Sequence, residues 1–273
     1  MDEISLTSSV QQSLLSLQRA AKAREQSAQH LATGLKVNDV VDEPVSYFQA
    51  KALSDRASDF LEAKDGIEQA ISAVEAASVG TEAMSEITRQ MRGIALSARG
   101  GSDEQRQAAS ERYDMLRTQL DELAKDISYS GVNLVQSEPD DLNVGLNDTG
   151  SSSVTIEGRA SDSSGLGISS ASFFGNFATD AAIDMATAEL SEATQTLRSN
   201  AASFGSNVAL LDARSDFVVN LSNTLEGGAS KLVIADMNEE AARQLSSQVR
   251  QELTLTSMKI TGSSERSILQ LIT

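Results

Sequence analysis

The stretch IDMATAELSEATQTLRSNAASFGSNVALLDARSDFVVNLSNTL, residues 183–225, decides the fold. Apolar and small residues recur along it at spacings that alternate between three and four, as they do on one face of an α-helix. A single extra spacing of four, from Leu197 to Ala201, is a stutter, which locally relaxes a left-handed supercoil. The stretch predicts a long coiled-coil helix, and the pair Gly227-Gly228 is expected to end it.

Helical periodicity also occupies most of the N-terminal half. A first helix is expected at about residues 4–34, and a second after the turn at Pro44, ending at Gly100-Gly101. The sequence SDEQ at residues 102–105 is a capping box, which predicts the start of a third helix that ends before Gly131. Because the connection between the second and third helices is short, they are expected to run antiparallel.

The region that follows differs in composition, because glycine, serine, aspartate and asparagine separate short alternating stretches such as VTI at residues 154–156. We interpret it as two or three β-hairpins or surface loops. Helical periodicity returns from Met237 to the apolar C-terminus. The predicted fold class is mainly α, a long antiparallel coiled-coil helical bundle with a small β-hairpin region inserted between its N- and C-terminal halves.

These patterns divide the chain into five segments. They are an N-terminal helix at 1–40, further helices at 41–130, the hairpin or loop region at 131–178, a coiled-coil helix at 179–230 and a C-terminal helix at 231–273.

Composition excludes several classes of function. The chain has no cysteine and a net charge of −17, so disulfides, thiol chemistry and a basic surface for nucleic acid are not expected. No apolar run reaches the length of a membrane span, so no membrane partner is expected. The charge is distributed unevenly along the chain. Residues 1–36 and 236–273 together have a net charge of zero, and residues 37–235 carry the whole net charge of −17. Near-neutral ends are suited to burial in an assembly.

No catalytic, metal or cofactor site is expected. The single histidine, His30, has no second histidine or cysteine to work with, so it is interpreted as a surface or interface residue. The acidic cluster of Asp39, Asp42 and Glu43 lacks the spacing of a calcium loop. The Gly165-Leu-Gly167 fragment lacks the remaining features of a phosphate-binding loop and is expected to be a turn.

The two terminal helices are not expected to be stable alone. Pairing them is expected to bury roughly ten aliphatic side chains. That gain does not offset the conformational entropy lost when about 70 residues become ordered. The ends are therefore expected to be disordered in the monomer and to fold on assembly, when neighbouring copies supply further apolar surface.

Several motifs lie in a characteristic order at both ends of the chain. They are SLLSL at 13–17, HLATGLKVN at 30–38 with DEP at 42–44, ITRQMRGIAL at 87–96, YSGVNL at 129–134, and the C-terminal segment from IADMNE at 234–239 to SILQLI at 267–272. Over about residues 1–135 and 180–273 the chain resembles bacterial flagellin, and it is similar to a short flagellin without large outer domains.

This resemblance implies a structural subunit that polymerises with itself into the flagellar filament for swimming motility. It implies terminal helices that line the inner tube and coiled-coil helices that form a surrounding shell. It also implies export through the flagellar type III apparatus with a chaperone, contact with the cap and the hook–filament junction proteins, an extracellular location and no cofactor.

On this interpretation we assign residues to three roles. Self-assembly of the terminal helices is assigned to Leu14, Leu17, Leu31, Leu245, Val249, Leu253, Ile260 and Leu269. The shell core is assigned to Met91, Ile94, Leu116, Leu120, Leu123, Leu197, Phe204, Val208 and Leu211. O-linked glycans are considered at Ser151, Ser152 and Ser153, or at the serines of residues 161–172.

Two alternatives remain open at this point. Pro44, directly after Asp42 and Glu43, is similar to the sequence of hook–filament junction proteins, which share the same architecture. A cytoplasmic coiled-coil signalling module would show the same helical stripes. The apolar segment at residues 267–272 disfavours that second alternative, because a signalling rod has no need to bury its end.

Overall fold

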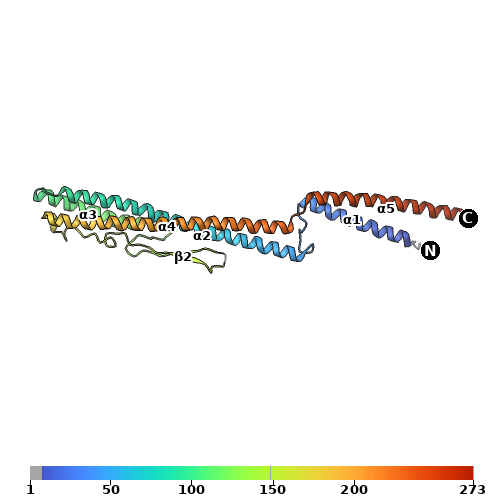
Figure 1. The fold of residues 1–273 in the computed structure, drawn as a ribbon, viewed down its shortest axis with the longest axis horizontal. Helices are drawn as coiled ribbons and strands as arrows, with labels where there is room; N and C mark the ends of the chain where they lie inside the picture. Colours follow the sequence, from blue (N-terminus) through green and yellow to red (C-terminus); the bar gives the residue numbers. More distant parts are fainter. Residues whose placement is uncertain (1–7, 148, 273) are drawn as a thin grey trace. The chain divides into compact units, whose positions relative to one another are not determined.

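The structure is a computed structural model that describes residues 8–147 and 149–272, without the side chains of residues 8, 9, 265, 266 and 268–272. The described helices are α1 (Ser8–Thr33), α2 (Pro44–Ser97), α3 (Asp103–Asp126), α4 (Asp180–Val233) and α5 (Met237–Ile272), with a 3-10 turn η1 at Gly175–Phe177. Strands β1 (Leu142–Gly145) and β2 (Ser153–Ile156) form one hairpin. The mainly α prediction is therefore confirmed (Figure 1).

The chain divides into two compact units. A terminal unit contains the described parts of residues 1–55 and 224–273, and a middle unit contains residues 56–223. Helices α2 and α4 each contribute residues to both units. No helix within residues 8–147 and 149–272 is long and apolar enough to cross a membrane.

In the terminal unit, α1 and α5 lie side by side and antiparallel (Figure 1). The segments between the helices join them through an antiparallel bridge between Leu35 and Ile234. The Lys36 amide donates to the Val233 carbonyl at 2.7 Å, and the Ala235 amide donates to the Gly34 carbonyl at 2.9 Å. The φ angle of Gly34 is 75°, which permits the chain to leave α1 in this direction.

The acidic turn before α2 has a structural role. The Asp42 carboxylate accepts hydrogen bonds from the amides of Asn38 at 3.0 Å and Asp39 at 3.1 Å. These backbone hydrogen bonds lower the pKa of Asp42. Pro44 is the first residue of α2, where its missing amide proton has no cost. Among the residues that the structure describes, no cluster of His, Asp or Glu could hold a metal ion.

The middle unit has a continuous core between α2, α3 and α4. The residues predicted for the shell core divide into two groups: Met91, Leu120, Leu197, Phe204 and Leu211 are buried, and Ile94, Leu116, Leu123 and Val208 are half-buried. The end of α3 approaches α2 so closely that a Cβ at Gly80 would clash with the side chain of Ile127, the residue directly after α3. Because Gly80 faces the end of α3, the antiparallel course of α2 and α3 is confirmed.

The capping box predicted for α3 is confirmed. The Gln105 amide donates to Ser102 Oγ at 3.4 Å, and the Ser102 amide donates to Gln105 Oε1 at 2.9 Å. One turn into the helix, Arg106 donates to the Phe177 carbonyl at 2.8 Å and to Asp180 at 2.7 Å. The start of α3 is thereby held against η1 and the start of α4.

The expectation that Gly227 and Gly228 end α4 is wrong, because the helix continues to Val233. The heptad-like burial continues through the glycines, from buried Val218 and Ser222 to buried Ala229. A glycine inside a helix costs only about 1 kcal/mol relative to alanine, so packing on both sides maintains the helix. The boundary predicted at residue 230 accordingly lies three residues too early.

Residues 131–178 form a single described hairpin and a fixed segment, where two or three hairpins or loops were expected. In the hairpin, Leu142 pairs with Ile156 and Gly145 pairs with Ser153. The following segment is held along α3 and α4 by carboxylates. Asp121 accepts from the Ser163 amide at 2.7 Å, and Glu189 accepts from the Ser169 amide at 2.9 Å. Buried Ser161 and Ser163 are consequently poor glycan acceptors.

Two neighbouring leucines of α4 provide a matched test of this core. Leu211 is fully buried, whereas Leu210 is 50% exposed. We expect Leu211→Ala to lower the free energy of unfolding by about 2–5 kcal/mol, because a buried leucine leaves a cavity. Leu210→Ala is expected to change it by less than about 1 kcal/mol. Urea unfolding followed by circular dichroism measures both, and equal losses would contradict this core.

Candidate assembly surface of the terminal helices

The interface between α1 and α5, here called the seam, is built from small and polar residues. Its buried members are Ala20, Ser27 and His30 of α1 and Glu240 and Ser247 of α5. Further along the seam, Arg24 Nη1 donates to Gln251 Oε1 at 3.3 Å. Among the described side chains, the pairing of α1 and α5 does not bury the roughly ten aliphatic side chains that were expected.

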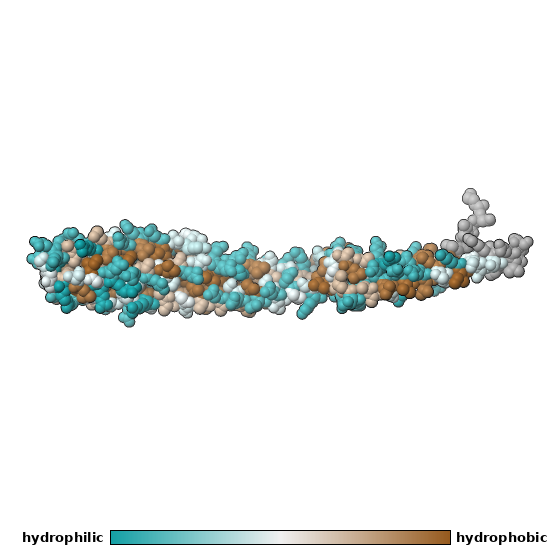
Figure 2. Space-filling view, turned by 90° about the horizontal axis from the view of Figure 1, so that it is seen from above, coloured by the Kyte–Doolittle hydropathy of each residue, from teal (hydrophilic) through white to brown (hydrophobic). Residues whose placement is uncertain are grey.

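The aliphatic residues of α5 form an exposed ridge, defined as Leu245, Val249, Leu253 and Ile260. Their exposed fractions are 63%, 47%, 64% and 61%. Each residue of a helix advances by about 100°, so Val249 lies about 200° round the helix from buried Ser247. The ridge consequently faces away from α1, and apolar side chains gather along the terminal helices in Figure 2.

The predicted assembly residues of α1 are less uniform. Leu14 is 39% exposed and lies outside the seam, whereas Leu17 and Leu31 are half-buried beside it. Leu269 belongs to α5, but its side chain lies outside the described residues. The structure thus brings the described assembly residues onto one helix pair, and Leu245, Leu253 and Ile260 of α5 are more than half exposed there.

The start of α2 carries an apolar patch that sequence reasoning missed. Val41 is 87% exposed, and Val45 and Phe48 of α2 are 66% and 60% exposed. These three residues are four and three apart, which is the spacing of one helical face. That spacing is the signal in the sequence from which the patch could have been predicted.

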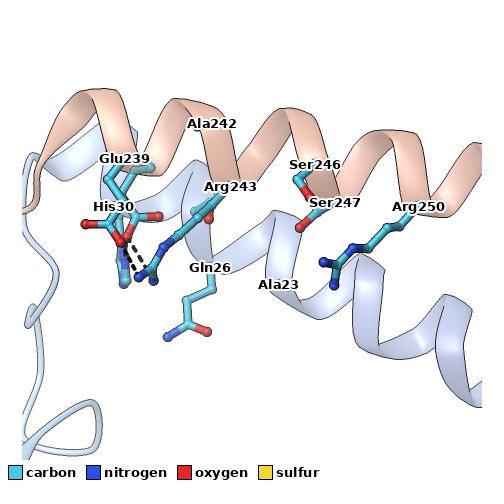
Figure 3. A pocket seen from close by; sticks show the side chains of 11 residues that line it. Ala23, Gln26, His30, Glu239, Ala242, Arg243, Ser246, Ser247 and Arg250 are labelled. Atoms are coloured by element: carbon cyan, nitrogen blue, oxygen red, sulfur yellow. Dashed lines mark hydrogen bonds and ion pairs between the residues drawn. The ribbon is translucent and has the colours of Figure 1, made fainter.

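One buried ionisable pair crosses the seam. Nδ1 of His30 lies 3.2 Å from Oε1 of Glu240, and the two side chains are 11% and 7% exposed. In Figure 3 the His30 side chain extends from α1 toward Glu239 and Arg243 of α5. A carboxylate can only accept, so Nδ1 donates to it. His30 is therefore an interface residue, in agreement with the sequence prediction.

The electrostatics around Glu240 favour its ionised form. Burial by itself raises the pKa of Glu240, but hydrogen bonds from His30 and Ser27 and the charges of His30 and Arg243 lower it below its ordinary value. The Arg243 guanidinium lies 3.8 Å from Glu240 and also pairs with Glu239 at 2.5 Å. The buried Glu240 carboxylate thus has the His30 imidazole and the Arg243 guanidinium beside it.

A groove of about 440 Å³ opens beside this pair. Its polar lining comes from Gln26, Ser27, Ser246, Arg243 and Arg250, and Figure 3 shows Arg250 reaching from α5 toward α1. The terminal helices thus combine an exposed apolar ridge with a polar seam.

The candidate glycan acceptors lie where the hairpin turns. Ser151 and Ser153 are exposed and Ser152 is half-buried. Ser151 Oγ accepts from Asn147 Nδ2 at 2.7 Å, and the Ser152 amide donates to Asn147 Oδ1 at 3.1 Å. The turn is therefore held by its own side chains, with two hydroxyl-bearing residues facing solvent.

Comparison with known proteins identifies the family. Residues 4–138 match the family model described as bacterial flagellin N-terminal helical region. A flagellin of Brucella melitensis is 26% identical over 279 residues, covering 99% of both chains. Flagellin FljO of Caulobacter vibrioides is 28% identical over 248 residues, covering 89% of this chain and 88% of the relative. The chain belongs to the bacterial flagellin family.

The fold of this flagellin also has a solved counterpart. The crystal structure of Bacillus cereus flagellin matches it with a TM-score of 0.50 and 20% identity, covering 56% of this chain and 88% of that chain. At this identity the match supports the fold alone. Family membership makes this flagellin a structural subunit of the flagellar filament, and self-polymerisation and motility follow from the family.

The relatives also bear on the two alternatives. A signalling coiled coil is disfavoured, because flagellins match over nearly the whole length of the chain. Pro44 does not by itself favour a junction protein, since it only starts α2.

Acid is expected to weaken the α1–α5 pair through Glu240. Because the folded pKa of Glu240 lies below its ordinary value of 4.5, its stabilisation is present above that value and is lost as pH falls through the folded pKa. Glu240→Gln is expected to weaken the pair at neutral pH and to reduce its dependence on pH below about 5. The measurement is helicity of assembled protein by circular dichroism during acid titration.

The control is Glu252→Gln, at an exposed glutamate on the same helix. It is expected to leave the parental acid transition unchanged. An acid transition of the same shape in Glu240→Gln and in the parent would contradict the role given to Glu240.

Proposed function

We propose that this flagellin polymerises by burying the α5 ridge against neighbouring copies of itself. The observation that supports this most strongly is the position of Leu245, Val249, Leu253 and Ile260, which are 47% to 64% exposed on the side of α5 away from α1. A soluble subunit gains nothing from an aliphatic row in water. A polymer gains about 1.5–3 kcal/mol for each such side chain that it buries completely.

Polymerisation also explains why the two units differ in how far they bury their apolar residues. The middle unit buries its own apolar residues, such as Phe204 and Leu211, and needs no partner for its core. The terminal unit leaves its largest aliphatic residues accessible and keeps a polar seam. We therefore propose that the terminal helices become ordered as copies associate, because the apolar burial they need is supplied only between chains.

The charges of the two regions support the same assignment. The terminal segments 1–36 and 236–273 sum to zero, whereas residues 37–235 carry −17. Close packing of many neutral ends avoids the repulsion that the acidic middle would produce. The Val41, Val45 and Phe48 patch extends the apolar surface of the terminal unit, and we propose that it is covered in the same polymer.

The remaining functional proposals follow from family membership. We propose that the subunit is exported through the flagellar type III apparatus with a chaperone, assembles beneath the cap, adjoins the hook–filament junction proteins and resides outside the cell. We also propose that it has no enzymatic activity, in keeping with a family of structural proteins.

We further propose O-linked glycans at Ser151, Ser152 or Ser153, since two of these residues face solvent at the turn of the hairpin. The expected result is an intact mass above that of the 273-residue sequence, with the excess removed by the triple change to alanine. The measurement is intact-mass spectrometry of protein from its native source. A mass equal to the sequence mass would rule the modification out.

The assembly proposal predicts that Leu253→Asp abolishes polymerisation. A carboxylate on the ridge cannot be buried between copies without a partner, and such burial costs more than the lost leucine contact. The middle unit is expected to keep its fold, because Leu253 lies outside residues 56–223. Electron microscopy after seeding, together with circular dichroism of the monomer, measures both effects.

Gln248→Asp is the matched control, because Gln248 is exposed on α5 and lies about 140° round the helix from Leu253. It is expected to polymerise normally, as is the parent chain. Long uniform filaments from the parent are the result expected of a filament subunit, and their absence would favour the junction protein. Filaments from Leu253→Asp would remove the ridge from the assembly surface.

A further inference from the structure

Two faces of α5 compete for the position against α1. One is the seam face with Glu240 and Ser247, and the other is the ridge, which lies about half a turn away. Burial of apolar surface alone would turn the ridge inward, since Leu17 and Leu31 of α1 lie beside the seam and could receive it. Such a pair would satisfy itself and leave little apolar surface for other copies.

Backbone contacts do not explain which face is chosen. The bonds from Lys36 to Val233 and from Ala235 to Gly34 lie before the first residue of α5, and they place the start of that helix beside the end of α1. Beyond them, His30 and Glu240 meet across the seam, with Nδ1 of His30 3.2 Å from Oε1 of Glu240.

The seam face of α1 needs polar partners. His30 and Ser27 are 9% and 5% exposed, and both donate to Glu240. If the ridge faced α1, these donors would be buried against aliphatic side chains and lose their acceptor. An unsatisfied buried polar group costs about as much as burying one aliphatic side chain gains. Leaving His30 and Ser27 unsatisfied would therefore offset the burial of about two aliphatic side chains, so the polar contacts oppose turning the ridge inward.

We infer that the buried His30–Glu240 pair, with Ser27 as a second donor, positions α5 so that its aliphatic ridge faces away from α1 and stays available to other copies. The inference rests on the proposed role of the ridge in assembly. Buried polar contacts fix the pairing of coiled-coil helices in the same way, at some cost in stability. His30 and Glu240 are thus positioning residues for polymerisation and need not contact the neighbouring copy.

The first test removes the pair with His30→Ala and Glu240→Ala together. Without the polar contacts the ridge is expected to turn toward α1, so the ends of the monomer become more resistant to protease than in the parent. Polymerisation is expected to slow by about tenfold, which corresponds to about 1.4 kcal/mol. Limited proteolysis of the monomer and seeded growth followed by light scattering measure the two effects.

The orientation of α5 can be measured by the reactivity of single introduced cysteines, because the chain has no cysteine of its own. Ser247→Cys and Val249→Cys are introduced one at a time into the parent and into the double-alanine chain. In the double-alanine monomer, the thiol at position 249 is expected to react more slowly with an alkylating reagent than the thiol at position 247. The parent is expected to show no such protection at position 249.

A second test exchanges the partners. His30→Glu alone places two carboxylates at the same point of the seam and is expected to stop polymerisation. Adding Glu240→His restores an acid and an imidazole in exchanged positions and is expected to restore polymerisation. The control is Arg24→Ala with Gln251→Ala, which removes an exposed contact of the same seam and is expected to polymerise like the parent.

Each alternative outcome overturns the inference. Parental growth of the double-alanine chain would show that the pair does not position α5. Slow growth with ends that are more sensitive to protease would show an ordinary stabilising contact, and so would failure of the exchanged pair. The proposed function is judged separately, by whether the parent chain forms filaments and Leu253→Asp does not.

Discussion

The polar seam between α1 and α5 is the constraint on which the assembly surface depends. Because His30 and Ser27 are buried in it, α5 must present Glu240 to α1 and cannot present its leucines there. Side chains on opposite faces of a helix point in opposite directions. When the polar face of α5 packs against α1, its aliphatic face therefore points outward. The same contact that joins the two ends of the chain therefore leaves them with unburied apolar surface, which is what a polymer requires.

The middle unit, in contrast, buries its apolar side chains within itself. Phe204, Leu211 and Tyr113 are fully buried there, and close approach of the helices is achieved where Gly80 admits Ile127. The serine-rich segment after the hairpin is tied to helix carboxylates, for example Ser163 to Asp121 at 2.7 Å. A unit that satisfies its own apolar and polar groups can fold before assembly, whereas the terminal unit completes its burial only with other copies.

Much of this architecture could be predicted from residue spacing. The capping box at Ser102 and the antiparallel return of α3 depend only on local hydrogen bonds and a short connection, so they were predicted correctly. The end of α4 was misplaced, because the propensity of Gly227 and Gly228 to break a helix is smaller than the packing of Ala229 beyond them. The apolar patch from Val41 to Phe48 was missed, because it begins in a turn and continues into a helix.

The sequence by itself determined that the chain forms long helices, that the ends are neutral, and that an aliphatic row including Leu253 runs along the last helix. It did not determine which way that row faces, because periodicity defines a face of a helix without saying what lies opposite it. Tertiary structure decided this through the Glu240 contacts with His30 and Ser27. The direction of a face depends on partners more than 200 residues apart in the chain, as His30 and Glu240 are with their separation of 210.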